Sequence, residues 1–278
     1  MREVLRRVVL NESDEDAPDG VGAAAAPGDL GEELARRCLA ARAVAARPSG
    51  RLDDESLATS EAWARVVDAA RAIESTRLAE LGGRPGRLAF WINVYNALAF
   101  HAIVGLGVRR SVREIPLFFA RVCYRIGGFR LSLDDIEHGI LRGNRRRLFP
   151  PWPPFRRLDP RGALALDSLD PRIHFALNCG AESCPPVGVY RASAIDQQLD
   201  LAARNFINRA VTLDAAGRVT CSRILRWYRR DFDPAGGVVA FVLGYLDDGP
   251  ARDALRAHAG QRLAWAPYRW TIDREPEE

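Results

Sequence analysis

Residues 88–104 have the sequence LAFWINVYNALAFHAIV, and this stretch decides the fold. Apolar side chains surround it on every side when it is drawn as a helix, which is the pattern of a fully buried helix. It is shorter than the roughly 20 apolar residues that cross a bilayer, and Asn93, Asn96 and His101 interrupt it. We therefore predict a central helix inside a globular core, and no membrane span.

The segments on either side of this helix indicate a mixed fold. Two alternating runs, 121–126 and 129–133, are joined by Gly127 and Gly128, which predicts a hairpin. Further helical patterns cover residues 30–47, 53–81, 194–208, 223–227, 238–246 and 250–258, and strand-like patterns cover 172–178, 211–221 and 265–272. Because helices and strands do not alternate regularly, we predict an α+β fold. In it, the buried central helix packs against a small antiparallel sheet, with hairpins and surrounding helices.

Composition divides the chain into two parts. Residues 1–29 hold an acidic cluster and then an Ala, Gly and Pro stretch, which buries too little apolar surface to offset its ordering entropy. We predict a flexible leader there and a single α+β domain over residues 30–278. The overall 47% of hydrophobic residues is enough for the core of such a domain.

The charged residues exclude several chemistries. All 40 basic residues are arginine, so Schiff-base catalysis, a pyridoxal-phosphate anchor and a phosphate-loop lysine are ruled out. The net charge of +4 is modest, and a nucleic-acid site would need a local patch. Residues 142–161 hold seven arginines and five prolines. We interpret them as a solvated loop and predict no nucleic-acid partner; the alternative is anion or nucleic-acid binding through this loop.

Five cysteines are too few, and odd in number, for a disulfide scaffold, and the first ten residues lack a secretory apolar run. Both observations favour a cytoplasmic protein.

Several stretches together resemble the domain-of-unknown-function family 547. They are FWINVYNAL (90–98), GGFRLSLDDIEHGILR (127–142), DPRIHFALNCG (170–180), SCPP (183–186), WY (227–228), DF (231–232) and PYRW (267–270). In family order they extend over residues 60–273, which we take as the family-like core. The family name implies no particular reaction.

At the level of the fold, a buried helix followed by a strand with a histidine also resembles the papain and transglutaminase superfold. In that superfold a cysteine at the start of the helix attacks the substrate. Here Trp91, Ile92 and Asn93 stand at that point, without a cysteine.

Two thiols lie in the family-like stretches. If residues 172–179 form a strand, His174 and Asn178 point to one face and Cys179 to the other. Cys184 follows a turn and precedes Pro185, in a loop at the strand end, where active residues are common. We therefore prefer Cys184 to Cys179 as the reactive thiol.

Polar residues inside apolar elements are the other candidates. Ser132 and Asp135 have the spacing of a capping box. On the helix after it, Glu137 shares the apolar face, so its carboxylate must either pair with an arginine or carry a raised pKa. His138 lies away from that face, as a rim or exposed group. Asn93 and Asn96 share one stripe of the central helix and either bridge the backbone or face a ligand.

Three hypotheses follow. The first is a thiol-dependent hydrolase or acyl transferase, with Cys184 as nucleophile, His174 as base, Asn178 or Asn93 as an orienting group and Glu137 behind them. The second is a non-catalytic module that binds a small molecule or peptide through Asn93, Asn96, His174 and Asn178, or in which these residues only hold the fold. His138 and Cys179 are further binding candidates. The third is the anion or nucleic-acid site on residues 142–161.

The spacing of Cys179 and Cys184 permits zinc or a local disulfide. There is no second close pair of ligands, so we predict no metal and no cofactor.

Overall fold

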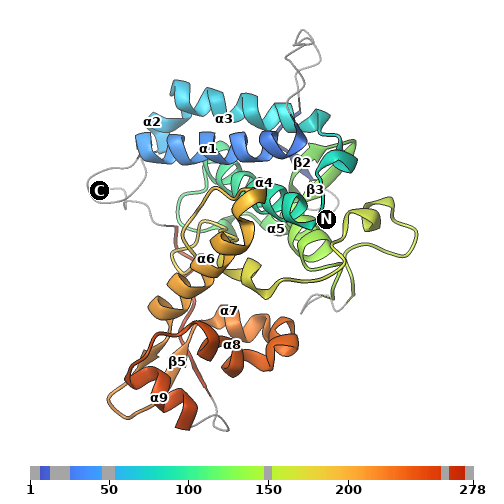
Figure 1. The fold of residues 1–278 in the computed structure, drawn as a ribbon. Helices are drawn as coiled ribbons and strands as arrows, with labels where there is room; N and C mark the ends of the chain where they lie inside the picture. The colour runs from blue at the N-terminus through green and yellow to red at the C-terminus, as the bar shows by residue number, and fades with distance from the viewer. Residues whose placement is uncertain (1–6, 13–25, 46–53, 147–151, 258–262, 273–278) are drawn as a thin grey trace.

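The computed structural model describes residues 7–12, 26–45, 54–146, 152–257 and 263–272. Its helices (α), short 3-10 helices (η) and strands are drawn in Figure 1. In chain order they are β1 (Val8–Val9), α1 (Pro27–Ala45), α2 (Asp54–Ala58), α3 (Glu61–Ala72), η2 (Ile73–Ser75), η3 (Leu78–Glu80), α4 (Arg84–Gly105), η4 (Val112–Glu114), α5 (Phe118–Arg121), β2 (Val122–Ile126), β3 (Phe129–Ser132), the π-helix η5 (Asp135–Leu141), η6 (Pro160–Leu164), η7 (Pro171–Phe175), η8 (Ala192–Ala194), α6 (Ile195–Ala210), β4 (Thr212–Leu213), β5 (Val219–Cys221), α7 (Arg223–Trp227), η9 (Arg229–Ala235), α8 (Gly237–Tyr245), α9 (Pro250–Ala257) and β6 (Ala264–Trp265).

Helix α4 is the centre of the structure. It begins after Gly83 with Pro85 in its first turn, where proline suits the helix, and every residue from 88 to 104 is buried. Within the described residues it is the one helix long and apolar enough to cross a membrane, but 94% of that stretch lies inside the protein. This is the burial expected of a core helix, and it confirms the predicted buried central helix.

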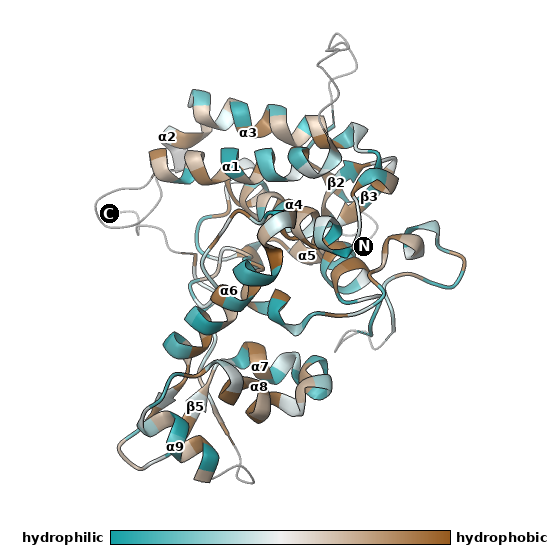
Figure 2. Cartoon of the chain, in the orientation of Figure 1, coloured by the Kyte–Doolittle hydropathy of each residue, from teal (hydrophilic) through white to brown (hydrophobic). Residues whose placement is uncertain are grey.

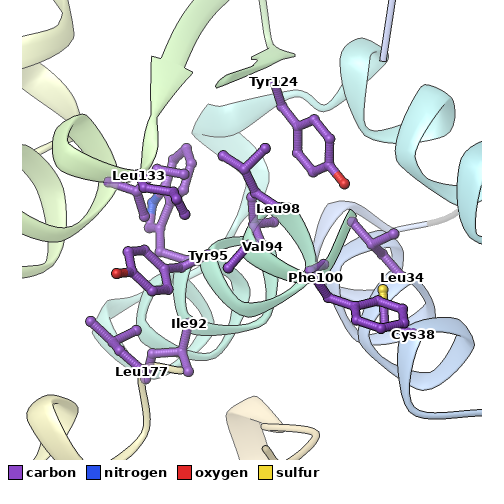
Figure 3. Close-up of a cluster of buried hydrophobic side chains, with 14 of the residues drawn as sticks. Leu34, Cys38, Ile92, Val94, Tyr95, Leu98, Phe100, Tyr124, Leu133 and Leu177 are labelled. Carbon is purple, nitrogen blue, oxygen red and sulfur yellow. The ribbon is translucent and has the colours of Figure 1, made fainter. Parts of the chain in front are cut away.

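The helices of the amino-terminal half cover one side of α4 (Figure 1). Figure 3 shows Phe100 of α4 packed beside Leu34 and Cys38 of α1, while Tyr95 lies on the opposite side of the helix, near Leu133 and Leu177. Gly31 allows α1 to come this close, because a Cβ there would lie 2.7 Å from Cδ2 of Phe90. In Figure 2 hydrophilic and hydrophobic residues alternate along α1, α3 and α6, as in helices with one buried face.

A three-stranded sheet, in the order β1-β2-β3, lies on the same core. Gly127 and Gly128 join β2 and β3 with φ of 53° and 82°, so the predicted hairpin is confirmed. Strand β1 pairs with β2 in parallel, as β6 does with β5 in the second sheet of the order β4-β5-β6. The sheets are therefore mixed, not wholly antiparallel as expected.

Residues 7–12 belong to this core, although the sequence placed them in a flexible leader. Asn11 is fully buried; its amide donates to the carbonyl oxygens of Ala70 and Arg125, both at 2.9 Å, and its oxygen accepts from the Arg125 N–H. Arg7 donates to Asp135 at 2.8 Å. These contacts with distant residues stabilise the strand, and composition alone does not reveal them. Residues 13–25 lie outside the described residues.

Two further elements differ from their sequence patterns. The helix expected over 53–81 is interrupted at Ser60, whose hydroxyl accepts from the Trp63 N–H and begins α3 anew. The strand expected over 172–178 is wrong: Asp170 accepts from the Arg172 N–H and Pro171 stands in the first turn of η7. An Asp-Pro start favours a helical turn over the alternating pattern that follows it. His174 and Cys179 therefore do not sit on opposite faces of a strand.

The described residues form two main hydrophobic clusters, one around α4 and one built from α6 to α9 and the second sheet. Two elements belong to both. Helix α6 contributes Leu199 to the first cluster and Phe206 to the second. In η7, Ile173 packs in the first cluster and Phe175 in the second. His174 lies between these two residues in the sequence, so η7 places it at the junction of the clusters.

The Asn11 contacts give a test of the amino-terminal strand. We expect Asn11→Ala to lower the free energy of unfolding by about 1–3 kcal/mol, because buried backbone groups of Ala70 and Arg125 lose their partner. The matched control is Glu12→Ala, whose exposed ion pairs should contribute less than about 1 kcal/mol. Chemical denaturation of both variants measures the difference. Equal stability of the two would show that residues 7–12 do not hold the core.

Candidate functional site

A cleft of about 1020 Å³ lies where the two hydrophobic clusters meet. Its walls come from α4, α5, η5, η7, the loop after η7, α7, the start of η9 and the segment near Trp270. The lining residues are Tyr95, Phe119, Asp134, Glu137, His138, Arg142, Arg146, His174, Leu177, Cys179, Cys184, Ile224, Arg226, Trp227, Tyr228, Arg229, Arg230, Tyr268 and Trp270. Five of the eight residues predicted for the site are among them.

The π-helix η5 carries the acidic wall of the cleft. The predicted capping box precedes it: the Ser132 N–H donates to Asp135 and the Asp135 N–H donates to the Ser132 hydroxyl. The wide π-turn then closes with the Arg142 N–H donating to the Glu137 carbonyl at 2.8 Å. π-Helical turns are uncommon and occur frequently at functional sites.

Glu137 is buried and hydrogen-bonded to two tyrosines. The Tyr228 hydroxyl donates to Oε1 at 2.5 Å and the Tyr95 hydroxyl donates to Oε2 at 3.2 Å. Burial opposes the charge, but His138, the Tyr228 hydrogen bond, His174 and Arg142 outweigh it, so the pKa of Glu137 is lowered. The carboxylate is therefore ionised at neutral pH, and its partners are tyrosine hydroxyls instead of an arginine.

Behind Tyr228 lies a buried charge network centred on Asp231. Arg142 donates to both carboxylate oxygens of Asp231, from Nε at 2.6 Å and from Nη2 at 2.9 Å. Nε2 of His174 lies 2.9 Å from Oδ2 of the same carboxylate, and the His174 ring stacks on Tyr228 with centroids 3.8 Å apart. Asp231, His174 and Arg142 are all buried, so the charges of this network are largely removed from water.

The network sets the charge of its members. Burial raises the pKa of Asp231, but the hydrogen bonds from His174 and Arg142 outweigh it and leave the pKa well below its usual range. For His174 burial is the largest effect, and it lowers the pKa despite the opposing carboxylates of Asp231 and Glu137. His174 is therefore held as a neutral imidazole whose Nε2–H donates to Asp231.

His138 lies at the rim of the cleft. Nη1 of Arg142 is 3.0 Å from Nδ1 of His138, and Asp134 lies 3.8 Å from its Nε2. Its side chain is partly exposed, as expected for a residue off the apolar face of the helix.

Three predicted asparagines hold backbone instead of lining the cleft. Asn93 bonds both the N–H and the carbonyl of Tyr190, so both ends of its amide are used. Asn96 donates to the Ala176 carbonyl and accepts from the Asn178 N–H. Asn178 donates to the Pro185 carbonyl at 2.6 Å and accepts from the Gly180 N–H at 2.7 Å. The backbone-bridging interpretation therefore accounts for their amides.

These contacts shape a tight loop that brings two thiols together. Gly180 turns the chain with φ of 86°, and the Cys184 N–H donates to the Ala181 carbonyl. The sulfurs of Cys179 and Cys184 then lie 3.2 Å apart, in hydrogen-bond contact and without a disulfide between them. The Tyr268 hydroxyl is 3.2 Å from the Cys184 sulfur, and the Cys179 N–H donates to that sulfur at 3.3 Å.

The contact between the two sulfurs shifts the pKa values of the two thiols in opposite directions. The hydrogen bond from Cys179 is the largest effect on Cys184, and together with those from Tyr268 and the backbone it lowers the pKa of Cys184 to about 7, against the effect of burial. The same sulfur contact, with burial, raises the pKa of Cys179 well above its usual value. Cys184 is therefore the sulfur that ionises first. Sequence analysis also preferred Cys184, but its argument assumed a strand over residues 172–179, and the structure has the helix η7 there.

Cys184 and His174 line the same cleft but bond to different partners. Within the described ranges no hydrogen bond joins them. Tyr95 also lines this cleft and donates to Glu137, and its pKa is raised by burial and then by Glu137, Cys179, Tyr228 and Cys184. The described part of the chain holds no group of three or more His, Cys, Asp or Glu placed to bind a metal ion.

The site also contains residues that sequence analysis did not select, namely Tyr95, Arg142, Tyr228, Asp231 and Tyr268. All five stand in family-like stretches: Tyr95 in 90–98, Arg142 at the end of 127–142, Tyr228 in WY, Asp231 in DF and Tyr268 in PYRW. Membership of a family-like stretch was therefore the one sign in the sequence that pointed to these residues. The local pattern of each stretch does not indicate which side chain faces the cleft.

The comparisons with known proteins name one family. Residues 78–207 match the family described as "Protein of unknown function, DUF547", so the chain resembles that family over this segment. No curated protein and no solved structure matches. The matched segment contains Glu137, His174, Cys179 and Cys184, whereas Tyr228, Asp231 and Tyr268 follow it.

The buried network predicts a strong effect of one charge. We expect Asp231→Asn to lower the free energy of unfolding by about 3–5 kcal/mol, because Arg142 is left buried without its counter-charge. The control is Asp233→Asn, two residues away and exposed, which should change stability little.

The pH dependence of this effect has a defined sign. The pKa of Asp231 is lower in the folded protein than its ordinary value of 3.8, so its stabilising contribution is complete above that value and is lost as the pH falls. Chemical denaturation at about pH 7 and at about pH 3 should show the difference between wild type and Asp231→Asn shrinking at acid pH. A constant or growing difference would contradict the role of the ionised carboxylate.

Proposed function

We propose that the protein is a thiol-dependent hydrolase or acyl transferase with Cys184 as its nucleophile. The observation that carries the proposal is the placing of Cys184 in the wall of a large cleft, where the Cys179 N–H and the Tyr268 hydroxyl lie 3.3 Å and 3.2 Å from its sulfur and help to lower its pKa to about 7. A thiol with this pKa is about half ionised at neutral pH, and the thiolate is the attacking form. The chemistry requires reduced thiols, so a cytoplasmic location is part of the proposal.

Because Cys184 is acidic, His174 has a role other than deprotonating the thiol. Since the thiol ionises without a base, the histidine is not needed to deprotonate it. The bond from Nε2–H to Asp231 leaves Nδ1 of the neutral ring as a proton acceptor, and stacking on Tyr228 holds the ring in place. His174 can therefore take a proton from an attacking water or acceptor.

The reaction has two steps. In the first, the Cys184 thiolate forms a bond to the carbonyl carbon of the substrate, the bond to the leaving group breaks, and the leaving group takes a proton from solvent water. In the second, water or an acceptor attacks the thioester carbon and loses a proton to His174. The C–S bond breaks, which releases the acyl group and restores the thiolate, and His174 then passes its proton to solvent. Water as the attacking group makes the protein a hydrolase; an alcohol or amine makes it an acyl transferase.

A second candidate function rests on the arginines of the cleft. The side chains of Arg146, Arg226, Arg229 and Arg230 line it, are exposed, and form no ion pair with any part of the chain that the structure describes. Trp227 lies beside them, with its ring 4.8 Å from that of Tyr268. Unpaired guanidinium groups beside aromatic rings suit a small ligand with an acidic group and a planar or apolar body. A non-catalytic module for such a ligand is the alternative.

The loop of residues 142–161 supports this small-ligand proposal over nucleic-acid binding. Arg142 and Arg145 are directed at Asp231, and Arg161 pairs with Asp135 and Asp159. These side chains neutralise carboxylates within the protein. Residues 147–151 of the loop lie outside the described residues.

The nucleophile is tested by alkylation of the intact protein. We expect the rate of iodoacetamide labelling at Cys184 to be half-maximal near pH 7, because the thiolate fraction follows the pKa. Mass spectrometry locates the label at each pH. Cys221 is the internal control, since burial raises the pKa of its thiol to about 11 and should keep it unlabelled. Labelling of Cys184 that follows a model thiol, with a pKa of about 8.5, would contradict the proposal.

The same variants separate the two candidate functions. A panel of p-nitrophenyl esters and thioesters measures acyl transfer by wild type, Cys184→Ser and Cys221→Ser. Turnover that is lost in Cys184→Ser and kept in Cys221→Ser supports the enzyme. Absence of turnover with any ester, together with ligand binding, supports the binding module instead.

The arginine-lined cleft is tested with phenyl phosphate, which joins an acidic group to an aromatic ring. We expect calorimetry to show binding that weakens about tenfold in the double variant Arg229→Gln/Arg230→Gln, because two cationic groups leave the cleft. The charge-matched control is Arg36→Gln/Arg65→Gln on α1 and α3, which should bind as wild type does. Equal affinities in both double variants would exclude the arginine site.

A further inference from the structure

We infer that Cys179 and Cys184 are a redox modification site, at which a hydroperoxide converts the two thiols into a reversible disulfide. The inference uses the same nucleophile as the proposed function, but the reaction is with an oxidant and its readout does not depend on acyl transfer.

The geometry of the loop carries the inference. The sulfurs lie 3.2 Å apart, so a disulfide of about 2.05 Å needs an approach of only about 1 Å. Four residues separate the cysteines, and hydrogen bonds fix the loop on both sides. Asn178 closes it onto Pro185, and the Glu182 N–H donates to the Thr271 carbonyl at 2.8 Å. The folded chain thus holds the thiols close to the arrangement that a disulfide requires.

The two thiols have the complementary properties of an attacking and a resolving cysteine. Cys184 is the more acidic and receives hydrogen bonds from the Cys179 N–H and the Tyr268 hydroxyl. Cys179 stays protonated and in contact with it. A thiolate with a protonated thiol beside it is the usual pattern of redox-sensitive cysteine pairs.

The position of the pair also allows the oxidant to reach it. Both cysteines line the cleft, although each is only 7% exposed. A hydroperoxide is small enough to enter a cleft of about 1020 Å³, and the hydroxyl of Tyr268 is placed to donate to the departing oxygen.

The chemistry balances in two steps. The Cys184 thiolate attacks the outer oxygen of the hydroperoxide, the O–O bond breaks, and the departing alkoxide or hydroxide takes up a proton, leaving a sulfenic acid on Cys184. The Cys179 sulfur then attacks the Cys184 sulfur. The S–O bond breaks, the Cys179 proton leaves with the hydroxide as water, and the disulfide forms. The cysteines lose two electrons in total, and the hydroperoxide gains them.

The remaining cysteines provide the contrast. Cys38, Cys123 and Cys221 are buried, and burial raises the pKa of each thiol to about 11 or 12. None has a second sulfur in hydrogen-bond contact within the described residues, which include all five cysteines. Oxidation should therefore be confined to one pair.

Formation of the bond would also control the proposed enzyme. A disulfide removes the Cys184 thiolate, so the oxidised protein has no nucleophile for acyl transfer. Reduction by a dithiol restores both sulfurs.

The experiment treats the full-length protein with hydrogen peroxide at neutral pH and follows it by intact-mass spectrometry without reductant. We expect the mass to fall by about 2 Da, the two hydrogens that the thiols lose. Peptide mapping should show a Cys179–Cys184 bond, and dithiothreitol should reverse it. Cys221→Ser is the control and should form the same bond at the same rate.

Two further variants test the roles of the two thiols. In Cys179→Ser the sulfenic acid of Cys184 has no resolving thiol, so dimedone should trap it. Cys179→Ala should behave in the same way and serves if the serine variant does not fold. Cys184→Ser should give neither a disulfide nor a dimedone adduct.

Each outcome bears on the inference separately from the proposed function. No mass loss in wild type, or a bond that involves another cysteine, would overturn the redox site even if esters are hydrolysed. A Cys179–Cys184 bond in a protein without ester turnover would establish the redox site and leave the enzyme unsupported.

Discussion

The ion pair of Arg142 with Asp231 is the interaction on which the rest of the structure depends. Arg142 follows the π-helix of the first cluster and Asp231 lies in η9 of the second, so the pair joins the two halves of the protein. A buried charge needs a counter-charge and hydrogen bonds. The bidentate contact of Arg142 and the hydrogen bond with His174 supply both to the Asp231 carboxylate. The same contact aligns Tyr228, which then reaches Glu137.

A second set of polar contacts positions the thiols. The side-chain amides of Asn96 and Asn178 are hydrogen-bonded to backbone groups around the loop. These hydrogen bonds hold Cys179 and Cys184 close together. The acidity of Cys184 is a consequence of this packing, because a lone buried thiol has a raised pKa, as Cys38 shows. The lowered pKa of Cys184 is therefore produced by the groups around it.

The features that the sequence predicted well depend on near neighbours in the chain. The apolar run of α4, the Gly127-Gly128 turn and the reciprocal bonds of Ser132 and Asp135 each follow from a few adjacent residues. The features that it missed depend on distant ones. Asn11 holds a strand through Ala70 and Arg125, and η7 replaced the expected strand because Asp170 and Pro171 start a helical turn. Of the predicted site residues, Glu137, His174 and the two cysteines line one cleft, whereas their partners Tyr228, Asp231 and Tyr268 stand 40 or more residues away from each of them in the sequence.

By itself the sequence determined the central helix, the α+β class, the absence of amine chemistry and the choice of thiols and histidine as candidates. These follow from composition and from periodicity, which act over short separations. Only the tertiary structure decided the charge and the partners of each group. Whether Glu137 is ionised, whether His174 is neutral and which cysteine is acidic depend on burial and on hydrogen bonds from distant segments. Those contacts exist only once the two clusters have packed together, since the free energy of a charge is set by the dielectric and the dipoles around it.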